Sequence, residues 1–510
     1  MRGVEHWCLT HRVANAPRYS QGRVLTSRRF VAAGSEFQRG ILAEHTVYAL
    51  RTPGQPPRTA SATLHHKLPD GPFRHLHSAD EQGRHLGRPT CSHRGLSRPM
   101  EPEPPIIAKT ATGHGVAFSR QERERHVYLV GKSGSGKSTA LFNLAMHDIH
   151  AGEGVAVIDP HGDLAEAVAD CIPPSRTHSV CYLDAADAER PVGFNPLANI
   201  PAERHALAAS GIVSAFKHLW RDSWGPRLEH FLFHGIVALL ASQRATLIDL
   251  PRLYTDEAFR APIIARIRDP ITARFWMQEY PQYDERYRAD AAAPILNKAG
   301  QFAASPAIRA ILGQTSPKFD LSDAMNNRGI LIANLAKGRI GEQPANLLGS
   351  LLVSHLQLVA MGRSELAPEK RVPFFSHIDE FQSFGTDAFA ALLSEARKFA
   401  AHFCLANQYI DQLAPSVRAA VLGNAGALVV FRVSGADADI LASEFDPLPP
   451  PELVDQPPYA AWLRRGIGHQ HIDLSPCLYP PQNRITIVRN QSRRNFGRAR
   501  AMIEQSFKNT

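Results

Sequence analysis

The chain has 510 residues, enough for about three domains of 100 to 200 residues each. Apolar residues make up 44% and charged residues 21%, which excludes a collagen-like chain, a coiled-coil rod and wholesale disorder. The formal net charge of +9 comes from the first 100 residues, which contain 15 Lys and Arg and 6 Asp and Glu. The rest of the chain contains 42 basic and 42 acidic residues and has no net charge. Any affinity of the body for nucleic acid must therefore come from local patches.

Cysteine usage and hydropathy exclude two further classes. Six cysteines occur without a CxxC pair, so the sequence predicts neither a disulfide framework nor a zinc ribbon. The longest apolar stretch, 232–240, has nine residues, whereas a bilayer span needs about 18 to 20. The first residues also lack the apolar core of a signal peptide. We therefore expect a cytoplasmic chain that does not cross a membrane unaided.

Residues 1–105 are rich in Arg, His, Pro, Gly and Ser and show no sustained apolar period. We expect a disordered basic segment there, because low-complexity termini are usually solvated. Two alternatives stay open. The segment is a basic arm for nucleic acid or acidic lipid, or the native chain starts near Met100 and the upstream residues are not natively translated.

From His126 the pattern becomes strand, glycine-rich loop, helix and strand, which predicts a βαβ unit within a first core segment, 106–199. Apolar runs predict the strands of a mainly parallel sheet at 126–130, 154–159, 180–184, 329–336, 372–380, 403–408 and 427–433.

Three further segments complete the predicted organisation. Residues 200–325 are mostly helical in pattern and interrupt the strands, so we expect an inserted all-α domain. A second core segment covers 326–450. A C-terminal extension, 451–510, ends in a basic tail with seven basic residues and one acid from Asn483 onward.

Residues 131–138 match GxxxxGK[ST], the Walker A pattern, and lie between a predicted strand and a predicted amphipathic helix. Glycines let backbone N–H groups turn inward around phosphate, and the following helix adds its positive end. We expect Lys137 to reach the β- and γ-phosphates and the Ser138 hydroxyl to hold Mg²⁺. The nucleotide-binding residues predicted in this way are Gly131, Ser133, Gly134, Ser135, Gly136, Lys137, Ser138 and Thr139. The alternative is a flexible Gly/Ser turn.

The nucleotide is expected to be ATP with Mg²⁺. A guanine-reading NKxD is missing, because the candidate at 297–300 reads NKAG and lacks the carboxylate. An LSGGQ-like signature is also missing, which disfavours an ABC ATPase. A motor ATPase with a RecA-like core remains, and it needs acids after a second strand, which FFSHIDE supplies.

We assign Asp379 to the Mg²⁺ shell and Glu380 to the attacking water. The alternative is that these acids only cap the next helix. Asp379 lies 242 residues after Lys137, and the inserted helical domain accounts for that gap.

Three further polar residues are candidates for the same site. Gln408 ends a core strand, where an amide can sense the γ-phosphate, although a turn-capping role is the alternative. Arg397 and Arg432 are candidates for an arginine finger that reaches the nucleotide of a neighbouring subunit, with a surface salt bridge as the alternative for each.

The loop IDPHGD after the strand at 154–159 lines the same crevice. Asp159 and His161 are candidates for a nucleotide contact there. Asp163 is equally well explained as the N-cap of the following helix.

Taken together, the motifs resemble the ATPase domain of TraG/TraD-type conjugative coupling proteins, within the HerA/FtsK superfamily of P-loop DNA pumps. The resemblance covers roughly 120–450 and rests on YLVGKSGSGKST, IDPHGD, FNPL, SWGPRLEH, NLAKGRIGE, HIDEFQSF, LSEARKF, LANQY and LGNAGALVVFRV.

The resemblance implies a RecA-like core with an all-α domain and a homo-hexameric ring. It implies ATP-driven, sequence-independent movement of DNA, which we expect to be single-stranded, toward a type IV secretion channel, with a relaxase and channel proteins as partners. By matching motifs, Lys137 and Ser138 carry over as nucleotide contacts, Asp379 and Glu380 as Walker B acids, Gln408 as the sensor, and Arg397 as the finger. Coupling proteins usually begin with a membrane anchor. None is visible here, so docking at the inner membrane is expected only through partners.

Lys337 and Arg339, after a core strand, are candidate DNA contacts, with an ordinary exposed loop as the alternative. The basic tail is a second candidate, with a solvated face as the alternative. Two other functions stay open beside the coupling-type DNA pump. One is a cytosolic HerA-like DNA-processing pump without a secretion channel. The other is a recruitment platform that binds ATP without translocation.

Overall fold

The structure is a computed structural model, and it describes residue 104 and residues 106–242 and 244–508. These residues belong to one compact unit, His93–Thr510. The expectations for residues 1–103 lie outside the described residues.

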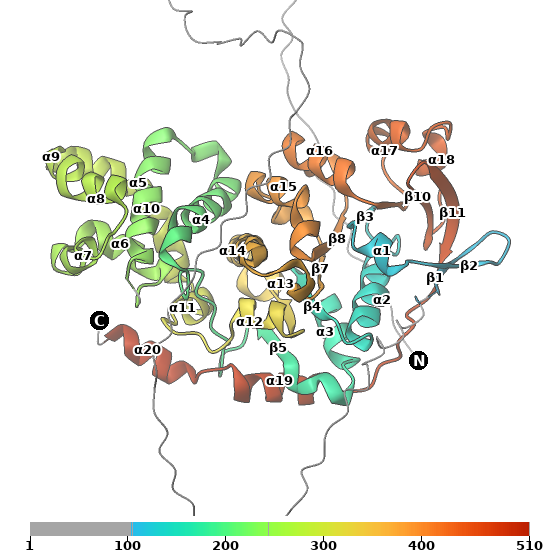
Figure 1. Ribbon diagram of the computed structural model, residues 1–510, viewed down its shortest axis with the longest axis horizontal. Helices are drawn as coiled ribbons and strands as arrows, with labels where there is room; N and C mark the ends of the chain where they lie inside the picture. Colours follow the sequence, from blue (N-terminus) through green and yellow to red (C-terminus); the bar gives the residue numbers. More distant parts are fainter. Residues whose placement is uncertain (1–103, 105, 243, 509–510) are drawn as a thin grey trace, which may run out of the picture. The chain divides into compact units, whose positions relative to one another are not determined.

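One sheet of eleven strands forms the centre of the described unit (Figure 1). The strands are β1 (Ile106–Thr110), β2 (Gly115–Ala117), β3 (Val127–Val130), β4 (Gly154–Asp159), β5 (Val180–Asp184), β6 (Ile330–Asn334), β7 (Phe374–Ile378), β8 (Ala401–Asn407), β9 (Ala427–Val430), β10 (Ala460–Arg465) and β11 (Gly468–Leu474). Their order in the sheet is β2-β1-β11-β10-β9-β3-β8-β7-β4-β6-β5.

The strands from β9 to β5 in that order pair in parallel, and every residue of these strands is buried. Continuous apolar runs are typical of strands covered on both faces, and for that reason the sequence predicted all seven. The expected fold class, an α/β P-loop fold with a mainly parallel sheet flanked by helices, is confirmed.

Four antiparallel strands at one edge of the sheet were missed by the sequence analysis. β10 pairs with β9 and β11, and β1 pairs with β11 and β2. The sequence indicates both hairpins only weakly. In each, an alternation of apolar residues is interrupted by a turn glycine, Gly113 between β1 and β2 and Gly466 between β10 and β11, with φ of +83° and +58°. Segment 451–510 therefore contributes strands to the core sheet as well as a tail.

Helices cover both faces of the sheet. They are α1 (Arg120–Arg123), α2 (Lys137–His150), α3 (Asp163–Asp170), α4 (His205–Leu219), α5 (Pro226–Leu240), α6 (Leu250–Thr255), α7 (Glu257–Ile264), α8 (Pro270–Arg274), α9 (Tyr280–Gln282), α10 (Glu285–Ala304), α11 (Pro306–Leu312), α12 (Leu321–Asn326), α13 (Lys337–Ile340), α14 (Glu342–Gly362), α15 (Asp387–Leu393), α16 (Pro415–Asn424), α17 (Gly435–Leu441), α18 (Pro451–Val454), α19 (Ile485–Asn495) and α20 (Arg500–Lys508).

The alternation of side chains along β4 shows the two layers. Val155 and Val157 join the core that α2 and α3 cover, and Ala156 and Ile158 join the core on the opposite face, which contains α4, α14 and α15. Between β5 and β6 the described residues form helices and connecting turns, and Figure 1 shows α5 to α10 gathered away from the strands.

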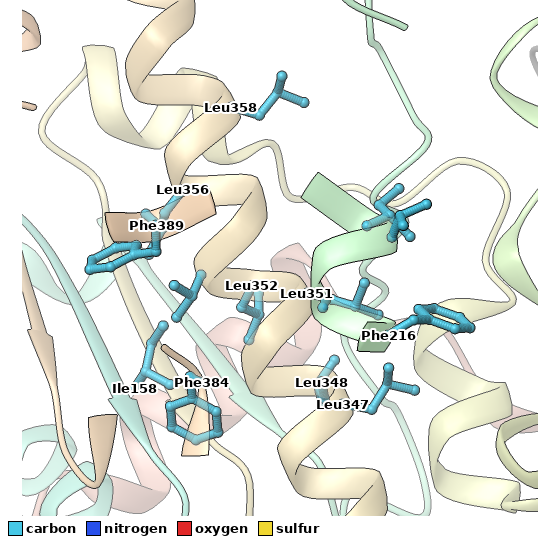
Figure 2. Close-up of a cluster of buried hydrophobic side chains, with 14 of the residues drawn as sticks. Ile158, Phe216, Leu347, Leu348, Leu351, Leu352, Leu356, Leu358, Phe384 and Phe389 are labelled. Atoms are coloured by element: carbon cyan, nitrogen blue, oxygen red, sulfur yellow. The ribbon is translucent and has the colours of Figure 1, made fainter. Parts of the chain in front are cut away.

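Helix α14 is the apolar centre of the second layer. Figure 2 shows Leu348, Leu352 and Leu356 of this helix beside Phe384, Phe389 and Ile158. The helical stretch Glu342–Glu365 is long and apolar enough to cross a membrane, but 78% of its apolar 18-residue segment is buried inside the protein. Burial of this kind is typical of the core helix of a globular domain, where each buried leucine side chain contributes about 1.5 to 3 kcal/mol.

The basic tail folds back onto the core. In α19, Arg493 donates to Asp187 at 2.7 Å, and Arg489 lies 3.6 Å from Glu166. These acids neutralise much of the charge on which a DNA-binding tail would depend, although Arg494 remains exposed. The tail is thus a folded helix with two of its arginines paired to acids, and its contact with DNA stays a prediction.

The contact between α14 and Phe384 gives a prediction about stability. A methyl group added at Gly349 would overlap the Phe384 ring, so Gly349→Ala should lower the free energy of unfolding by about 1 to 3 kcal/mol. Gly300→Ala in α10 is the control, because no atom lies within 4 Å of the added methyl group, and it should gain up to about 1 kcal/mol in helix propensity. Denaturant unfolding of both variants measures this. Equal effects of the two changes would contradict the packing.

Candidate active site

The strand order brings the predicted site residues to one edge of the sheet. β8 lies between β3 and β7, and Val130 at the end of β3 is opposite Asn407 at the end of β8. The phosphate loop follows β3, the acids follow β7 and Gln408 follows β8. Since parallel strands end at the same edge, segments more than 240 residues apart in sequence meet there.

The phosphate loop has the backbone that an anion requires. Gly134 and Gly136 have φ of +73° and +116°, a region that L side chains rarely adopt. A Cβ at Gly131 would lie 2.6 Å from Cβ of Phe431, so this position also excludes a side chain. Gly136 starts α2 without a side-chain cap, which leaves the first N–H groups of the helix free for an anion.

The other predicted loop residues surround this backbone. Ser133 is exposed and Thr139 is half-buried on the first turn of α2. Ser135 is buried, and its Oγ has no hydrogen-bond partner among the described residues. The loop residues therefore fit a polyphosphate.

Lys137 is folded back onto its own loop. Its Nζ donates to the carbonyl oxygens of Gly131 at 2.6 Å and Lys132 at 3.1 Å. Burial lowers the pKa of Lys137, and the charges of Asp379 and Glu380 oppose that shift. The ammonium thus stays at the loop, held by carbonyl oxygens and attracted by the two acids.

The Ser138 hydroxyl donates to Oδ2 of Asp379 at 3.1 Å. Asp379 is 6% exposed, and its Oδ1 accepts the backbone N–H of Glu380 at 2.9 Å. Burial, with the charges of Asp159 and Glu380, raises the pKa of Asp379 to about 6. A divalent cation between Ser138 and Asp379 would remove this repulsion. Mg²⁺ is often bound by one or two protein ligands, with waters and phosphate oxygens completing its octahedron, so the pair fits it.

Glu380 and Gln408 form the second contact of the site. Gln408 Nε2 donates to Oε1 of Glu380 at 2.8 Å, and Gln382 donates to Oε2. Glu380 has φ of +48°, which is unusual for a residue with a side chain and is typical of functional positions. The two amides hold this carboxylate beside the loop.

Asp159 has a structural use that explains its burial. Its Oδ1 accepts the N–H of His161 and its Oδ2 the N–H of Ala165, both at 2.9 Å. Asp163 is the first residue of α3 and not its N-cap, so Asp159 caps this helix from the preceding strand. His161 is exposed.

The two arginine candidates lie at opposite ends of the parallel strands. Arg397 is exposed on a 3₁₀ turn, Ala396–Phe399, immediately before β8, so it lies at the opposite edge from the phosphate loop. Arg432 follows β9 at the loop edge, and its carbonyl accepts the N–H of Lys132 at 2.8 Å. Helix α15 ends at Leu393, before this 3₁₀ turn.

One residue beside the loop was missed by the sequence analysis. Tyr459 is 50% exposed, and its backbone N–H donates to the carbonyl of Ser135 at 2.9 Å. Its only signal in the sequence is its place directly before the strand at 460–465, and this strand was not predicted.

Solved structures share the fold of this chain. The bacterial conjugative coupling protein TrwBdeltaN70, in an unbound monoclinic form, aligns with a TM-score of 0.54 and 16% identity over 75% of this chain and 92% of that chain. TrwB in complex with ADP and Mg²⁺ gives 0.54 and 17% over 76% and 93%. VirB4 of Thermoanaerobacter pseudethanolicus gives 0.52 and 15% over 74% and 97%. The chain therefore has the fold of these proteins.

No protein-family model matches the chain, and no curated protein sequence matches it either.

The raised pKa of Asp379 gives a prediction with a defined sign. In the folded protein this carboxyl keeps its proton up to about pH 6, whereas its ordinary pKa is 3.8. Between these values the folded state binds more protons, so the free energy of unfolding falls as the pH rises. Asp379→Asn removes that fall. In the absence of nucleotide its stability relative to the unsubstituted protein should increase by about 2 to 3 kcal/mol between pH 4 and pH 7.

Denaturant unfolding across this pH range measures the difference. Asp290→Asn, at an exposed position of α10, is the control and should stay within about 0.5 kcal/mol of the unsubstituted protein throughout. An Asp379→Asn difference that is independent of pH would contradict the assignment.

Proposed function

We propose that the protein is an ATP-hydrolysing motor of the conjugative coupling type, which uses the site at the ends of β3, β7 and β8 to move DNA. The observation that carries the proposal is the hydrogen bond from Ser138 to Asp379, which joins the phosphate loop to the acids across 241 residues of sequence. The fold shared with TrwB and VirB4 supports it.

The ligands named for TrwB support the choice of nucleotide and metal. Its structures contain ADP with Mg²⁺, and the non-hydrolysable analogues ADPNP and GDPNP. In the present protein, the loop N–H groups and Lys137 hold the phosphates of ATP, and Ser138 and Asp379 hold Mg²⁺. When bound, Mg²⁺ neutralises charge on the phosphate oxygens.

Glu380 and Gln408 act on the water side of the reaction. The Glu380 carboxylate orients the attacking water and accepts its proton, because it lies beside the loop and its oxygens are held by amide donors. Gln408, hydrogen-bonded to Glu380, reports whether the γ-phosphate is present. Loss of phosphate changes what the amide can contact, and the change passes to β8.

The proposal also covers a hexameric ring of subunits, the contacts with DNA and the partner proteins. In the proposed homo-hexamer, Arg397 reaches the nucleotide of a neighbouring subunit, and its exposure at the end of the sheet opposite the phosphate loop supports this role. α13 follows β6 at the nucleotide edge and carries Lys337 and Arg339, which grip DNA phosphates without reading sequence. A relaxase and type IV secretion channel proteins are the proposed partners, and they hold the protein at the inner membrane.

Two variants test the proposed hydrolysis of ATP. Lys137→Ala should abolish detectable ATP turnover because phosphate positioning is lost. Glu380→Gln should keep ATP bound and slow turnover by about 10²- to 10⁴-fold because the base is lost. Lys370→Ala, at an exposed position before β7, is the control and should not change either quantity. Steady-state turnover and nucleotide dissociation constants measure this. A Lys137→Ala protein that still supports function in cells would favour the recruitment platform instead.

The proposed binding of DNA gives a separate prediction. DNA should stimulate ATP turnover, and the affinity for single-stranded DNA should fall steeply with salt, by about 0.7 in the logarithmic slope for each phosphate contact. Replacing both Lys337 and Arg339 with alanine should reduce that slope by about 1 to 2 units, and Lys370→Ala should leave it unchanged. Titrations at several salt concentrations measure the slope. Turnover that ignores both single- and double-stranded DNA would contradict a DNA pump.

A further inference from the structure

An exposed aromatic side chain lies against the start of the P-loop helix. A methyl group at Gly136 would lie 3.1 Å from Cδ1 of Tyr459, and 3.3 Å from Phe431 and Leu474, so the three side chains surround this glycine. Phe431 and Leu474 are buried, whereas Tyr459 is 50% exposed. Only the tyrosine ring is accessible to a ligand from solvent.

The backbone fixes where this ring lies. The N–H of Tyr459 donates to the carbonyl of Ser135 at 2.9 Å, and its carbonyl accepts the N–H of Leu474 at 2.7 Å. Tyr459 also has φ of +66°, which a tyrosine adopts only when its surroundings impose it. The segment before β10 is therefore tied directly to the phosphate loop, and the ring is held beside that loop.

Strand order shows which end of a nucleotide would reach the ring. The γ-phosphate end belongs beside Asp379, Glu380 and Gln408, which come from β7 and β8 on one side of β3. Tyr459 precedes β10, on the other side of β3, beyond β9. A triphosphate that lies across the start of α2 with its γ end at the acids directs its nucleoside toward the side that carries Tyr459.

We propose that Tyr459 is the platform on which the nucleobase stacks, an inference that rests on the proposed nucleotide-binding function of this site. A flat π face binds a purine by stacking and makes no hydrogen bond to the edge of the base. The platform therefore adds affinity without choosing between adenine and guanine. ATP and GTP should bind with dissociation constants within about fivefold of each other.

Three variants of the full chain test the platform. Tyr459→Phe keeps the ring, Tyr459→Leu keeps an apolar side chain over Gly136 without a π face, and Tyr409→Leu removes another exposed tyrosine, near the end of β8, as the control. Dissociation constants are measured with Mg²⁺ for ATP, for GTP and for inorganic tripolyphosphate, which has the phosphates but no base.

Tyr459→Leu should weaken ATP and GTP by about 5- to 150-fold and leave tripolyphosphate within about twofold. Tyr459→Phe and Tyr409→Leu should bind all three ligands as the unsubstituted protein does. Unchanged ATP affinity in Tyr459→Leu would overturn the platform and leave the proposed function standing. A parallel loss of tripolyphosphate would also overturn it, because the ring would then support only the phosphate loop. An unsubstituted protein that binds none of the three ligands would overturn both proposals.

Discussion

The hydrogen bond between Ser138 and Asp379 is the contact on which the rest of the site depends, because it joins the start of α2 to the end of β7. Asp379 is nearly buried, close to Asp159 and Glu380, so its carboxyl resists ionisation without a positive partner. A cation bound beside Asp379 would favour the ionised carboxylate and oppose the effects of burial and of the neighbouring acids. The Lys137 ammonium is hydrogen-bonded to the loop carbonyls, and its positive charge partly stabilises the ionised form of Asp379.

A second contact fastens the same helix to the same strand. Asp148, near the end of α2, is fully buried and pairs with Arg123, and it lies 3.0 Å from Nε2 of His377 in β7. Burial lowers the pKa of His377 to about 3, so this imidazole is neutral at physiological pH and donates its N–H to Asp148. Breaking a buried pair of this kind costs about 3 to 5 kcal/mol. α2 and β7 are thus joined at both ends of the helix, and the phosphate loop and the acids keep their spacing.

The parts predicted from the sequence share a physical cause. The parallel strands are buried along their whole length and mostly apolar, and the phosphate loop needs glycines at particular dihedral angles, so both leave a mark in the sequence. The hairpins β1–β2 and β10–β11 lie at the sheet edge, where Lys109, His469 and Asp473 interrupt the apolar pattern. Tyr459 was missed for a different reason, because its place beside the phosphate loop depends on pairing between distant strands.

Charge on its own was a poor guide to the C-terminal tail. Seven basic residues after Asn483 read as a solvated or DNA-binding segment, but in α19 Arg489 and Arg493 meet acids on the core. Whether a basic run is free depends on acids brought near it by the fold, and the local sequence does not contain that information. The domain boundaries and the roles of all the predicted site residues, Arg397 and Gln408 among them, stay predictions.

The long gap between loop and acids has a simple explanation in the sheet. The chain leaves at β5 and returns at β6, which are paired neighbours at the edge of the sheet farthest from the antiparallel strands. Helices inserted there do not alter the spacing of β3, β8 and β7. The return strand β6 leads to α13, and in this segment the N–H of Leu335, after β6, donates to the carbonyl of Asp159, and that of Lys337, at the start of α13, donates to the carbonyl of Pro160. Asp159, whose charge helps to raise the pKa of Asp379, therefore lies between the segment that carries the proposed DNA contacts and the acid proposed to hold the metal.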